Sequence, residues 1–185
     1  MMVETENTPN PDTLKFLPGK KVSEVGPIEF LKKDKSINIP LASKILSLDG
    51  TLMVFFGTDF ITVKKEKDLK WENLKHSIIS EINDHYSKGN SVVISKKLNK
   101  QFTETKSTES NEIINKINEV LDSKVRPAVA KDGGDITFKS FKDGVVTVEL
   151  KGSCSGCPSS VMTLKQGVQN LLCHYIPEVK SVEAI

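Results

Sequence analysis

The first half of the chain alternates short apolar runs that favour strands with longer ones that favour helices. Apolar and polar residues alternate where strands are expected, and apolar residues recur three or four apart where helices are expected. Gly57, Thr58 and Asp59 separate two of the strands and predict a hairpin. The expected strands cover residues 13–17, 52–56 and 60–64, and the expected helices cover residues 40–46 and 68–86. The pattern predicts a compact α+β domain over residues 1–94.

The second half predicts the order helix, hairpin, helix and strand. Asp143 and Gly144 lie between two strand-like runs and are the strongest short-range signal for a β-hairpin. Pro127 is expected to bend or restart the first helix, and Pro158 fits the first position of the second helix. The apolar face of the second helix is expected at Val161, Leu164, Val168, Leu171, Leu172 and Tyr175. This half predicts an α-β-β-α-β domain over residues 112–185.

Residues 95–111, between the two halves, contain only two large apolar residues, Leu98 and Phe102. The stretch is rich in lysine, serine, threonine, glutamine and glutamate, so it lacks the side chains needed to build a core. We therefore predict an α+β protein of two small domains joined by a flexible linker.

Charge and composition argue against partners of two kinds, nucleic acids and membranes. Residues 1–94 hold 13 basic and 13 acidic residues, and residues 111–185 hold 9 of each, so the net charge of +2 comes from the stretch between them. Neither half has the basic excess that binding to a phosphate backbone requires. No run approaches the roughly 20 apolar residues of a membrane span, and the acidic start resembles neither a secretory signal nor a transit peptide. We expect no nucleic acid or membrane partner and a cytoplasmic location; a mature mitochondrial matrix protein would look the same.

The candidate chemistry lies where the predicted hairpin meets the long helix. Cys154 and Cys157 stand three residues apart there, and flanking glycines let the backbone bend around whatever the sulfurs bind. With Pro158 at the first helical position, Cys157 is expected at the cap, where unpaired N–H groups and the helix dipole favour a thiolate. A thiolate is the form that binds a soft metal or attacks a disulfide.

Three interpretations of this pair compete: a metal or cluster site, a dithiol redox site, and two buried structural cysteines. Both cysteines lie in a glycine- and serine-rich loop where nothing calls for burial, which disfavours the structural interpretation. A thioredoxin-like redox site needs a parallel crossover before the motif, whereas the strands here are expected to be antiparallel. A zinc-stabilised interaction module needs four ligands, and one pair supplies two.

Four short motifs of the second half are distinctive: DGGD at residues 132–135, GSCSGCPSS at 152–160, TLKQGV at 163–168 and IPEV at 176–179. Together they closely resemble the C-terminal domain of the NifU-like (Nfu) iron–sulfur scaffold proteins. The first half carries TPNP at residues 8–11, LKF at 14–16, PG at 18–19 and VFFGTDFITV at 54–63. These motifs resemble the N-terminal domain of the mitochondrial and alphaproteobacterial-type members.

The resemblance implies a cluster carrier and not an enzyme. It implies that Cys154 and Cys157 bind a labile iron–sulfur cluster, usually 4Fe-4S, and that the protein delivers this cluster to apo-proteins. The partners would be apo iron–sulfur clients and upstream assembly factors. Cys173 has no place in the family pattern, so the resemblance assigns it no role.

Several other residues have a plainer interpretation beside a functional one. Asp132 and Asp135 could surround the cluster ligands and adjust the properties of the site. Their presence beside two glycines is more simply explained by a tight turn that aspartate side chains stabilise. His76 and His85 lie nine residues apart and are expected on the surface. Four phenylalanines that could form a partner-binding surface are favoured as core residues by their strand spacing. These are Phe16, Phe55, Phe56 and Phe60.

The number of cysteines predicts a dimer when the cluster is bound. A 4Fe-4S or 2Fe-2S cluster commonly takes four protein ligands, and the motif supplies two. If the helix from Pro158 is unbroken, Cys173 lies roughly 24 Å along it from Cys157 and is expected to point away from the apolar face. We therefore predict a homodimer whose cluster bridges the two subunits, with ligands from both chains or partly from a small thiol such as glutathione.

The predicted linker leads to a proteolysis experiment. Because residues 95–111 lack core-forming side chains, a protease at low concentration should cut there first and release two folded fragments. The C-terminal fragment should take up a cluster by itself, measured as iron bound per fragment. Resistance of this stretch to cleavage would argue for a single unit, and an isolated fragment without iron would give the first domain a direct role in binding.

Overall fold

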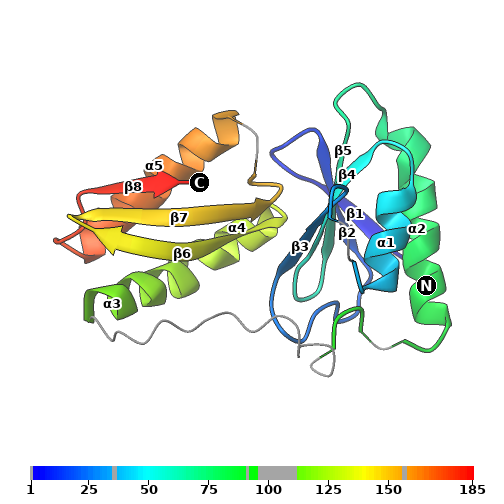
Figure 1. Ribbon diagram of the computed structural model, residues 1–185, viewed down its shortest axis with the longest axis horizontal. Coiled ribbons are helices and arrows are strands. Elements are labelled where there is room, and N and C mark those ends of the chain that lie inside the picture. The colour runs from blue at the N-terminus through cyan, green and yellow to red at the C-terminus, as the bar shows by residue number, and fades with distance from the viewer. Residues whose placement is uncertain (1, 35–36, 91, 96–111, 156–157) are drawn as a thin grey trace. The chain divides into compact units, whose positions relative to one another are not determined.

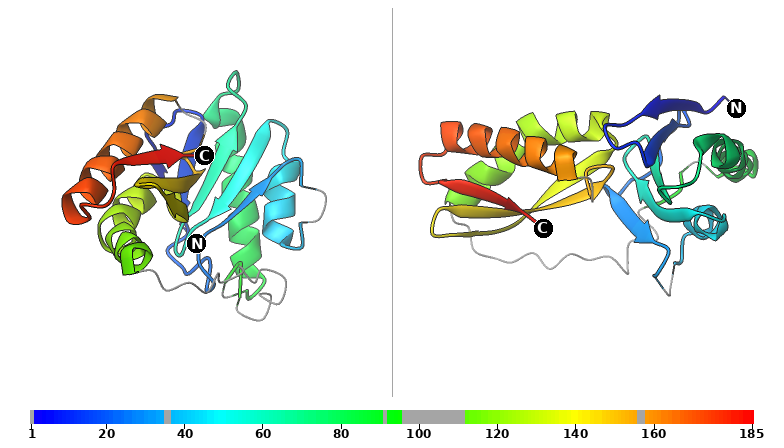
Figure 2. Two further views of the ribbon diagram at one scale, coloured as in Figure 1. Left: turned by 60° about the vertical axis from the view of Figure 1, so that its left-hand side comes forward. Right: turned by 90° about the horizontal axis from the view of Figure 1, so that it is seen from above.

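The structure is a computed structural model that describes residues 2–34, 37–90, 92–95, 112–155 and 158–185, without the side chains of residues 158–160. The chain divides into two compact units, Met1–Thr103 and Glu104–Ile185. Each unit combines one β-sheet with α-helices (Figures 1 and 2), which confirms the predicted α+β class. The predicted linker falls outside the described residues except for Ser95, so it stays a prediction.

The first unit is a five-stranded antiparallel sheet in the order β1-β2-β5-β4-β3. Helices α1 and α2 lie side by side on one face of this sheet (Figure 1). The predicted strands and helices of this half are confirmed, whereas β1 and β3 were not expected. The elements are β1 (Glu4–Asn7), β2 (Thr13–Leu17), β3 (Ile28–Leu31), α1 (Pro40–Ser47), β4 (Thr51–Phe56), β5 (Ile61–Lys65) and α2 (Trp71–Ser87).

Strand β1 shows why a pattern of apolar residues misses an edge strand. Its four residues are polar, and none of them is buried. Pairing with β2 supplies its backbone hydrogen bonds, and Glu6 adds an ion pair at 3.1 Å to Lys15 of the neighbouring strand. A strand that gains its order from a neighbour carries no alternation of its own, because neither of its faces packs on a core.

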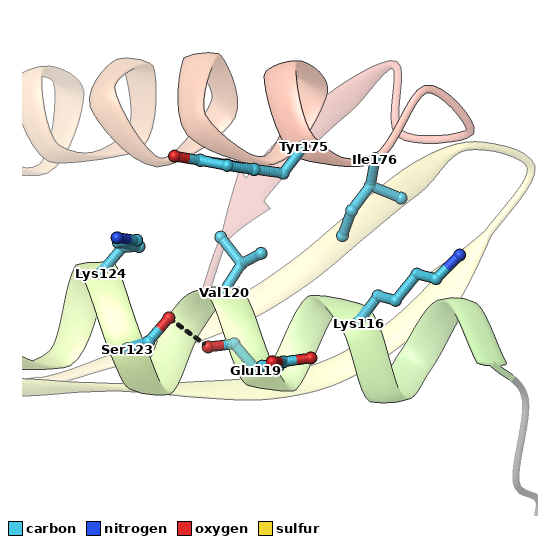
Figure 3. Close-up of a pocket in the computed structure, with 7 residues that line it drawn as sticks. All are labelled: Lys116, Glu119, Val120, Ser123, Lys124, Tyr175 and Ile176. Atoms are coloured by element: carbon cyan, nitrogen blue, oxygen red, sulfur yellow. Dashed lines mark hydrogen bonds between the residues drawn. The ribbon is translucent and has the colours of Figure 1, made fainter.

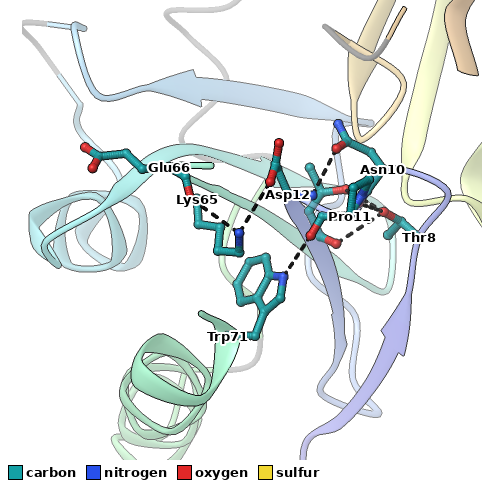
Figure 4. A network of polar contacts seen from close by, with 8 residues as sticks. Thr8, Asn10, Pro11, Asp12, Lys65, Glu66 and Trp71 are labelled. Carbon is teal, nitrogen blue, oxygen red and sulfur yellow. Dashed lines mark hydrogen bonds and ion pairs between the residues drawn. The ribbon is translucent and has the colours of Figure 1, made fainter. Parts of the chain in front are cut away.

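A polar network anchors the loop between β1 and β2 (Figure 4). The Lys65 ammonium lies 3.3 Å from the Asp12 carboxylate and 5.6 Å from the centre of the Trp71 ring. The Trp71 indole N–H donates a hydrogen bond of 3.2 Å to the carbonyl of Pro11, and the buried Asn10 accepts the N–H of Asp12. These contacts attach the loop that carries the TPNP motif to the start of α2. They give the residues of this motif a structural role in the fold.

The second unit is a three-stranded sheet in the order β6-β7-β8, with its helices on one face (Figures 1 and 2). Strands β6 and β7 are antiparallel, and β8 runs parallel to β7. The predicted order of helix, hairpin, helix and strand is confirmed. The elements are α3 (Glu112–Val120), the π-helical turn η2 (Leu121–Val125), α4 (Arg126–Lys131), β6 (Gly134–Lys142), β7 (Val145–Gly152), α5 (Pro158–Tyr175) and β8 (Ser181–Ala184).

Pro127 restarts the first helix of this unit through a wide turn. Proline has no N–H to donate, and its ring clashes with the carbonyl of the preceding turn. The chain widens into η2, where the Arg126 N–H donates to the carbonyl of Leu121, five residues back. Helix α4 then begins at Arg126 and ends at Lys131, before Gly133 with its positive φ of 80°. The π-helical turn and α4 together bring Gly134, the second glycine of the DGGD motif, to the first position of β6.

The hairpin turn at Asp143 and Gly144 also positions the last strand. Both residues have positive φ, 54° and 87°, as a tight two-residue hairpin turn requires. The Gly144 carbonyl accepts hydrogen bonds from the N–H groups of Lys180 at 2.7 Å and Ser181 at 3.3 Å. The turn predicted from sequence therefore serves two purposes, because it reverses the chain and fixes the start of β8.

Each unit buries its own apolar core. The four phenylalanines singled out in the sequence are all buried, and Phe16 and Phe56 belong to the core of the first unit, which confirms the core interpretation for these two. His76 is exposed as expected, whereas His85 is half-buried and its ring nitrogen lies 3.2 Å from the carbonyl of Val92. Tyr175 was expected on the apolar face of α5, but 50% of its surface is exposed because it occupies the last turn of the helix. No helix among the described residues is long and apolar enough to cross a membrane.

Two glycines of the second unit offer substitutions with opposite expected effects. Any residue at position 144 must adopt a positive φ, which is unfavourable for a residue with a Cβ. A Cβ there would also lie 3.2 Å from the backbone oxygen of Glu178 and 2.8 Å from the Lys180 side chain. We expect Gly144→Ala to lower the free energy of unfolding of this unit by about 1–2 kcal/mol.

Gly167 is the matched control, because a Cβ there would meet nothing within 4 Å on the exposed face of α5. Gly167→Ala should raise the free energy of unfolding by up to about 1 kcal/mol. The free energy of unfolding of each variant is measured by urea denaturation, followed by circular dichroism. Equal effects of the two changes would contradict the assigned turn geometry.

Candidate metal centre

Cys154 lies in a tight turn between β7 and α5. Gly152 ends β7 with a positive φ of 69°, and the Ser155 N–H and hydroxyl both donate to the Gly152 carbonyl, at 3.2 and 2.9 Å. The Ser153 N–H donates to the carbonyl of Gly133 at 3.2 Å, and the Ser153 hydroxyl donates to the carbonyl of Asp132. The turn is therefore fastened to the DGGD segment, which precedes it by about 20 residues.

The expectation that nothing calls for burial in this loop is wrong for Cys154. Only 6% of its surface is exposed, and it belongs to the buried core of the second unit. The sequence suggested an open loop because glycine and serine surround the cysteine. The structure instead turns this side chain inward, where a small apolar group fills core space as readily as an alanine would.

Gly134 makes room for the buried sulfur. A Cβ at Gly134 would lie 2.7 Å from the Cys154 Sγ and 2.6 Å from the backbone oxygen of Lys151, closer than real Cβ atoms approach. Gly134 faces Gly152 across the β6–β7 pair, so two glycines lie opposite each other at the end of the hairpin. The second glycine of the DGGD motif is thus required by close approach, whereas the first, Gly133, has the positive φ.

The pKa of the Cys154 thiol is raised to about 11, mainly by burial in this core. The hydrogen bond with Ser153 partly offsets this increase, and the nearby carboxylates of Asp132 and Asp135 add to it. At neutral pH the empty protein therefore holds Cys154 as a neutral thiol. Because this thiol is stabilised in the folded state, its contribution to stability is present at neutral pH and is lost as the pH rises toward about 11.

The two aspartates of the DGGD motif have different roles. Asp132 is exposed and ends α4, where its N–H donates to carbonyls of that helix. Asp135 is buried in β6, so the turn interpretation is wrong for this residue. Its carboxylate lies 3.5 Å from the Arg126 guanidinium; burial raises the pKa of Asp135, and Arg126 partly offsets that increase. Arg126 also donates to the carbonyl of Ile136 at 3.1 Å, so it links α4 to β6.

Cys157 lies outside the described residues, and its assignment rests on the sequence. Helix α5 does begin at Pro158, as predicted, so residue 157 immediately precedes the first helical residue. The expectation of a thiolate at the helix cap therefore stays a prediction for this residue. Among the described residues, no three His, Cys, Asp or Glu side chains are grouped so that they could hold a metal ion.

Cys173 lies far along α5 from this site. The helix is unbroken from Pro158 to Tyr175, and the 15 residues from Pro158 to Cys173 span about 22 Å. Cys173 was expected to point away from the apolar face, but it is half-buried against the core of the second unit. It flanks the buried Leu172, and a helix this close to a sheet partly covers the neighbours of its central apolar row.

A hollow of about 280 Å³ lies at the other end of this unit, between α3 and the last turn of α5 (Figure 3). Tyr175 covers one side of it, and Lys116 and Lys124 stand at its two ends (Figure 3). Its lining contains no cysteine, and the length of α5 separates it from Cys154. The remaining lining residues are Glu119, Val120, Ser123 and Ile176.

Comparison with known proteins gives two family matches. Residues 3–89 match the family described as scaffold protein Nfu/NifU N terminal, and residues 117–183 match the NifU-like domain. A human protein named NFU1 iron-sulfur cluster scaffold homolog, mitochondrial, is 44% identical over 100% of this chain, which covers 72% of that protein. NifU-like protein 4, mitochondrial, of Arabidopsis thaliana is 43% identical over 99% of this chain and 65% of its own length.

A solved structure is also similar in part. The solution structure of a NifU-like protein from Saccharomyces cerevisiae is 29% identical, covers 52% of this chain and 86% of its own, and superposes with a TM-score of 0.47. The matches to both family domains, and the 44% identity to a relative of which the chain covers 72%, establish that the chain belongs to the Nfu family of NifU-like proteins.

Proposed function

We propose that this protein is an iron–sulfur cluster scaffold and carrier, which binds a labile 4Fe-4S cluster and transfers it to apo-proteins. The observation that carries this proposal is 44% identity, over the whole chain, to a relative named as an iron–sulfur cluster scaffold. The relatives extend beyond the matched region, since the chain spans about two thirds of their length. The cluster is the cargo of the protein, and carrying it needs ligands and no catalytic group.

The proposed cluster ligands are Cys154 and Cys157. Thiolates are the preferred ligands of iron–sulfur clusters, and the pair stands at the start of α5. Transfer is then an exchange of ligands without change of oxidation state. Each client thiol gives up a proton as its sulfur binds iron, and each sulfur that leaves iron on the carrier takes up a proton.

The alternative functions have lost their support. A thioredoxin-like site would follow a parallel strand crossover, whereas β6 and β7 before the motif are antiparallel. A zinc-stabilised module needs four ligands for each zinc, and the described residues bring no third ligand to Cys154.

The proposed partners are apo iron–sulfur clients and upstream assembly factors. Both matched relatives are named as mitochondrial proteins, whereas the sequence favoured the cytoplasm. We therefore propose a reducing compartment, which includes the cytoplasm and the mitochondrial matrix, because the site requires reduced thiols. We also retain residues 1–94 and 112–185 as the two domains, with residues 95–111 as their linker.

Removal of the proposed ligands tests the assignment. Cys154→Ala and Cys157→Ala should each reduce bound iron to less than about a tenth of the wild-type amount, because the remaining thiolates cannot hold a cluster. Alanine is chosen because a serine hydroxyl at the buried position 154 would cost about 1–3 kcal/mol without a partner. Iron and sulfide are measured after anaerobic reconstitution, with circular dichroism as the check of folding.

Cys173→Ala is the matched control, because it removes the third thiol of the chain far from the site. It should leave bound iron unchanged. Iron close to wild-type in a folded Cys154 or Cys157 variant would contradict the assignment, and loss of iron in the Cys173 variant would make that residue a ligand.

The ligand count predicts the oligomeric state. The chain has three cysteines, so one chain cannot supply the four thiolates of a common 4Fe-4S site. We expect the loaded protein to be a homodimer with the cluster between two subunits, and the empty protein to have a smaller mass. Native mass spectrometry without added thiols measures both. A loaded monomer with four iron atoms would rule out the bridging cluster.

A further inference from the structure

The buried sulfur of Cys154 conflicts with the role that the proposed function gives it. A cluster ligand must present its sulfur to iron and to the bulky sulfide cage around it. Cys154 exposes 6% of its surface, and its Sγ lies against the backbone of Gly134, where even a methyl group would be too close. The described conformation therefore cannot hold a cluster at this sulfur.

Hydrogen bonds from Ser153 and Ser155 help to keep the turn in this conformation. Two close the turn on itself, from the N–H and hydroxyl of Ser155 to the Gly152 carbonyl. Two fasten it to the preceding segment, from the N–H and hydroxyl of Ser153 to the carbonyls of Gly133 and Asp132. The bonds from Ser153 join segments about 20 residues apart in sequence, so they must break if the turn moves away from the DGGD segment.

Ser153 also contacts the buried thiol. Its hydroxyl oxygen lies 4.0 Å from the Cys154 Sγ, and Ser153 as a residue is buried, with 2% of its surface exposed. Because the serine gives its only hydroxyl proton to the Asp132 carbonyl, its oxygen can accept the S–H of Cys154. The same side chain thus fastens the turn and holds the sulfur inside.

We propose that residues 152–155 form a latch, which hides Cys154 in the empty protein and must open to present this sulfur to a cluster. Ser153 is the positioning residue of the latch, and Gly134 provides the space into which the sulfur closes. The inference rests on the proposed function, because it takes Cys154 as a cluster ligand. It adds that loading and release are coupled to opening and closing of this turn.

The latch favours release of the cluster. Closing returns Cys154 to the core and restores the hydrogen bonds of Ser153, and only the empty protein gains these contacts. Each contact that stabilises the closed state alone weakens the net affinity for the cluster, because loading must first break it. A carrier benefits from this, since it has to bind its cargo less tightly than the client does.

Alkylation of the empty protein tests occlusion directly. Iodoacetamide should modify Cys154 in the native empty protein at least about tenfold more slowly than in urea, as measured by mass spectrometry of the peptide that carries it. Ser153→Ala should speed this modification about five- to tenfold, the factor expected for loss of one hydrogen bond worth about 1 kcal/mol. Equal rates in native and unfolded protein would overturn the latch.

Ser123→Ala is the matched control. It removes a hydroxyl that donates to the Glu119 carbonyl at 2.7 Å on the far side of the unit, and it should leave the rate at Cys154 unchanged. Ser155→Ala is a second variant of the latch itself, and it should speed modification less than Ser153→Ala because the Ser155 N–H bond remains. A Ser153→Ala rate equal to that of the control would overturn the role of Ser153.

Iron release separates a latch from a merely structural contact. The reconstituted Ser153→Ala protein should lose iron to a chelator several-fold more slowly than wild type, because its closed empty state is less stable. A structural contact would act the other way, and faster loss of iron would overturn the latch. These outcomes differ from failure of the proposed function, which would appear as normal iron in the Cys154→Ala and Cys157→Ala variants.

Discussion

The close approach of Gly134 and Cys154 constrains the packing of the second unit at the point where its chemistry is expected. Gly134 is the first residue of β6, and Cys154 follows β7 in the turn that leads to α5. One van der Waals contact therefore joins the end of the first helical region, the open end of the hairpin and the start of the long helix. It requires glycine on one side and a side chain no larger than cysteine on the other, because protein interiors leave no spare space at such distances.

This contact depends on an irregularity in the middle of the hairpin. From the turn at Asp143 and Gly144 the two strands pair in simple register, but between Phe138 and Ser140 the register shifts by one residue. The extra residue on β6 brings Gly134 opposite Gly152. Without it, Gly134 would move past the end of β7, and each residue between the bulge and Gly134 would change faces. The bulge thus places a glycine, and not the aspartate beside it, against the sulfur.

The sequence predicted the elements of both units better than it predicted what their side chains contact. Local constraints on the backbone can be recognised from the sequence. Such constraints produce the hairpin at Asp143 and Gly144, the restart of the helix at Pro127 and the helix that begins at Pro158. The burial of Cys154 depends on a glycine 20 residues away and on a bulge that no motif marks. The edge strand β1 likewise owes its order to pairing with β2, so its polar residues gave no signal.

Cys154 belongs to the core and is also the proposed iron ligand, and one sulfur cannot serve both roles at once. Folding of the second unit is favoured when Cys154 is neutral and enclosed, whereas an iron ligand must be ionised and open to its partner. A permanent metal site resolves such a conflict by enclosing the metal with all its ligands, and this chain has too few cysteines to do so. Whatever free energy the fold gains by burying the sulfur is subtracted from the affinity for the cluster. The competition that makes this site a poor permanent holder of a cluster is the property that a carrier requires.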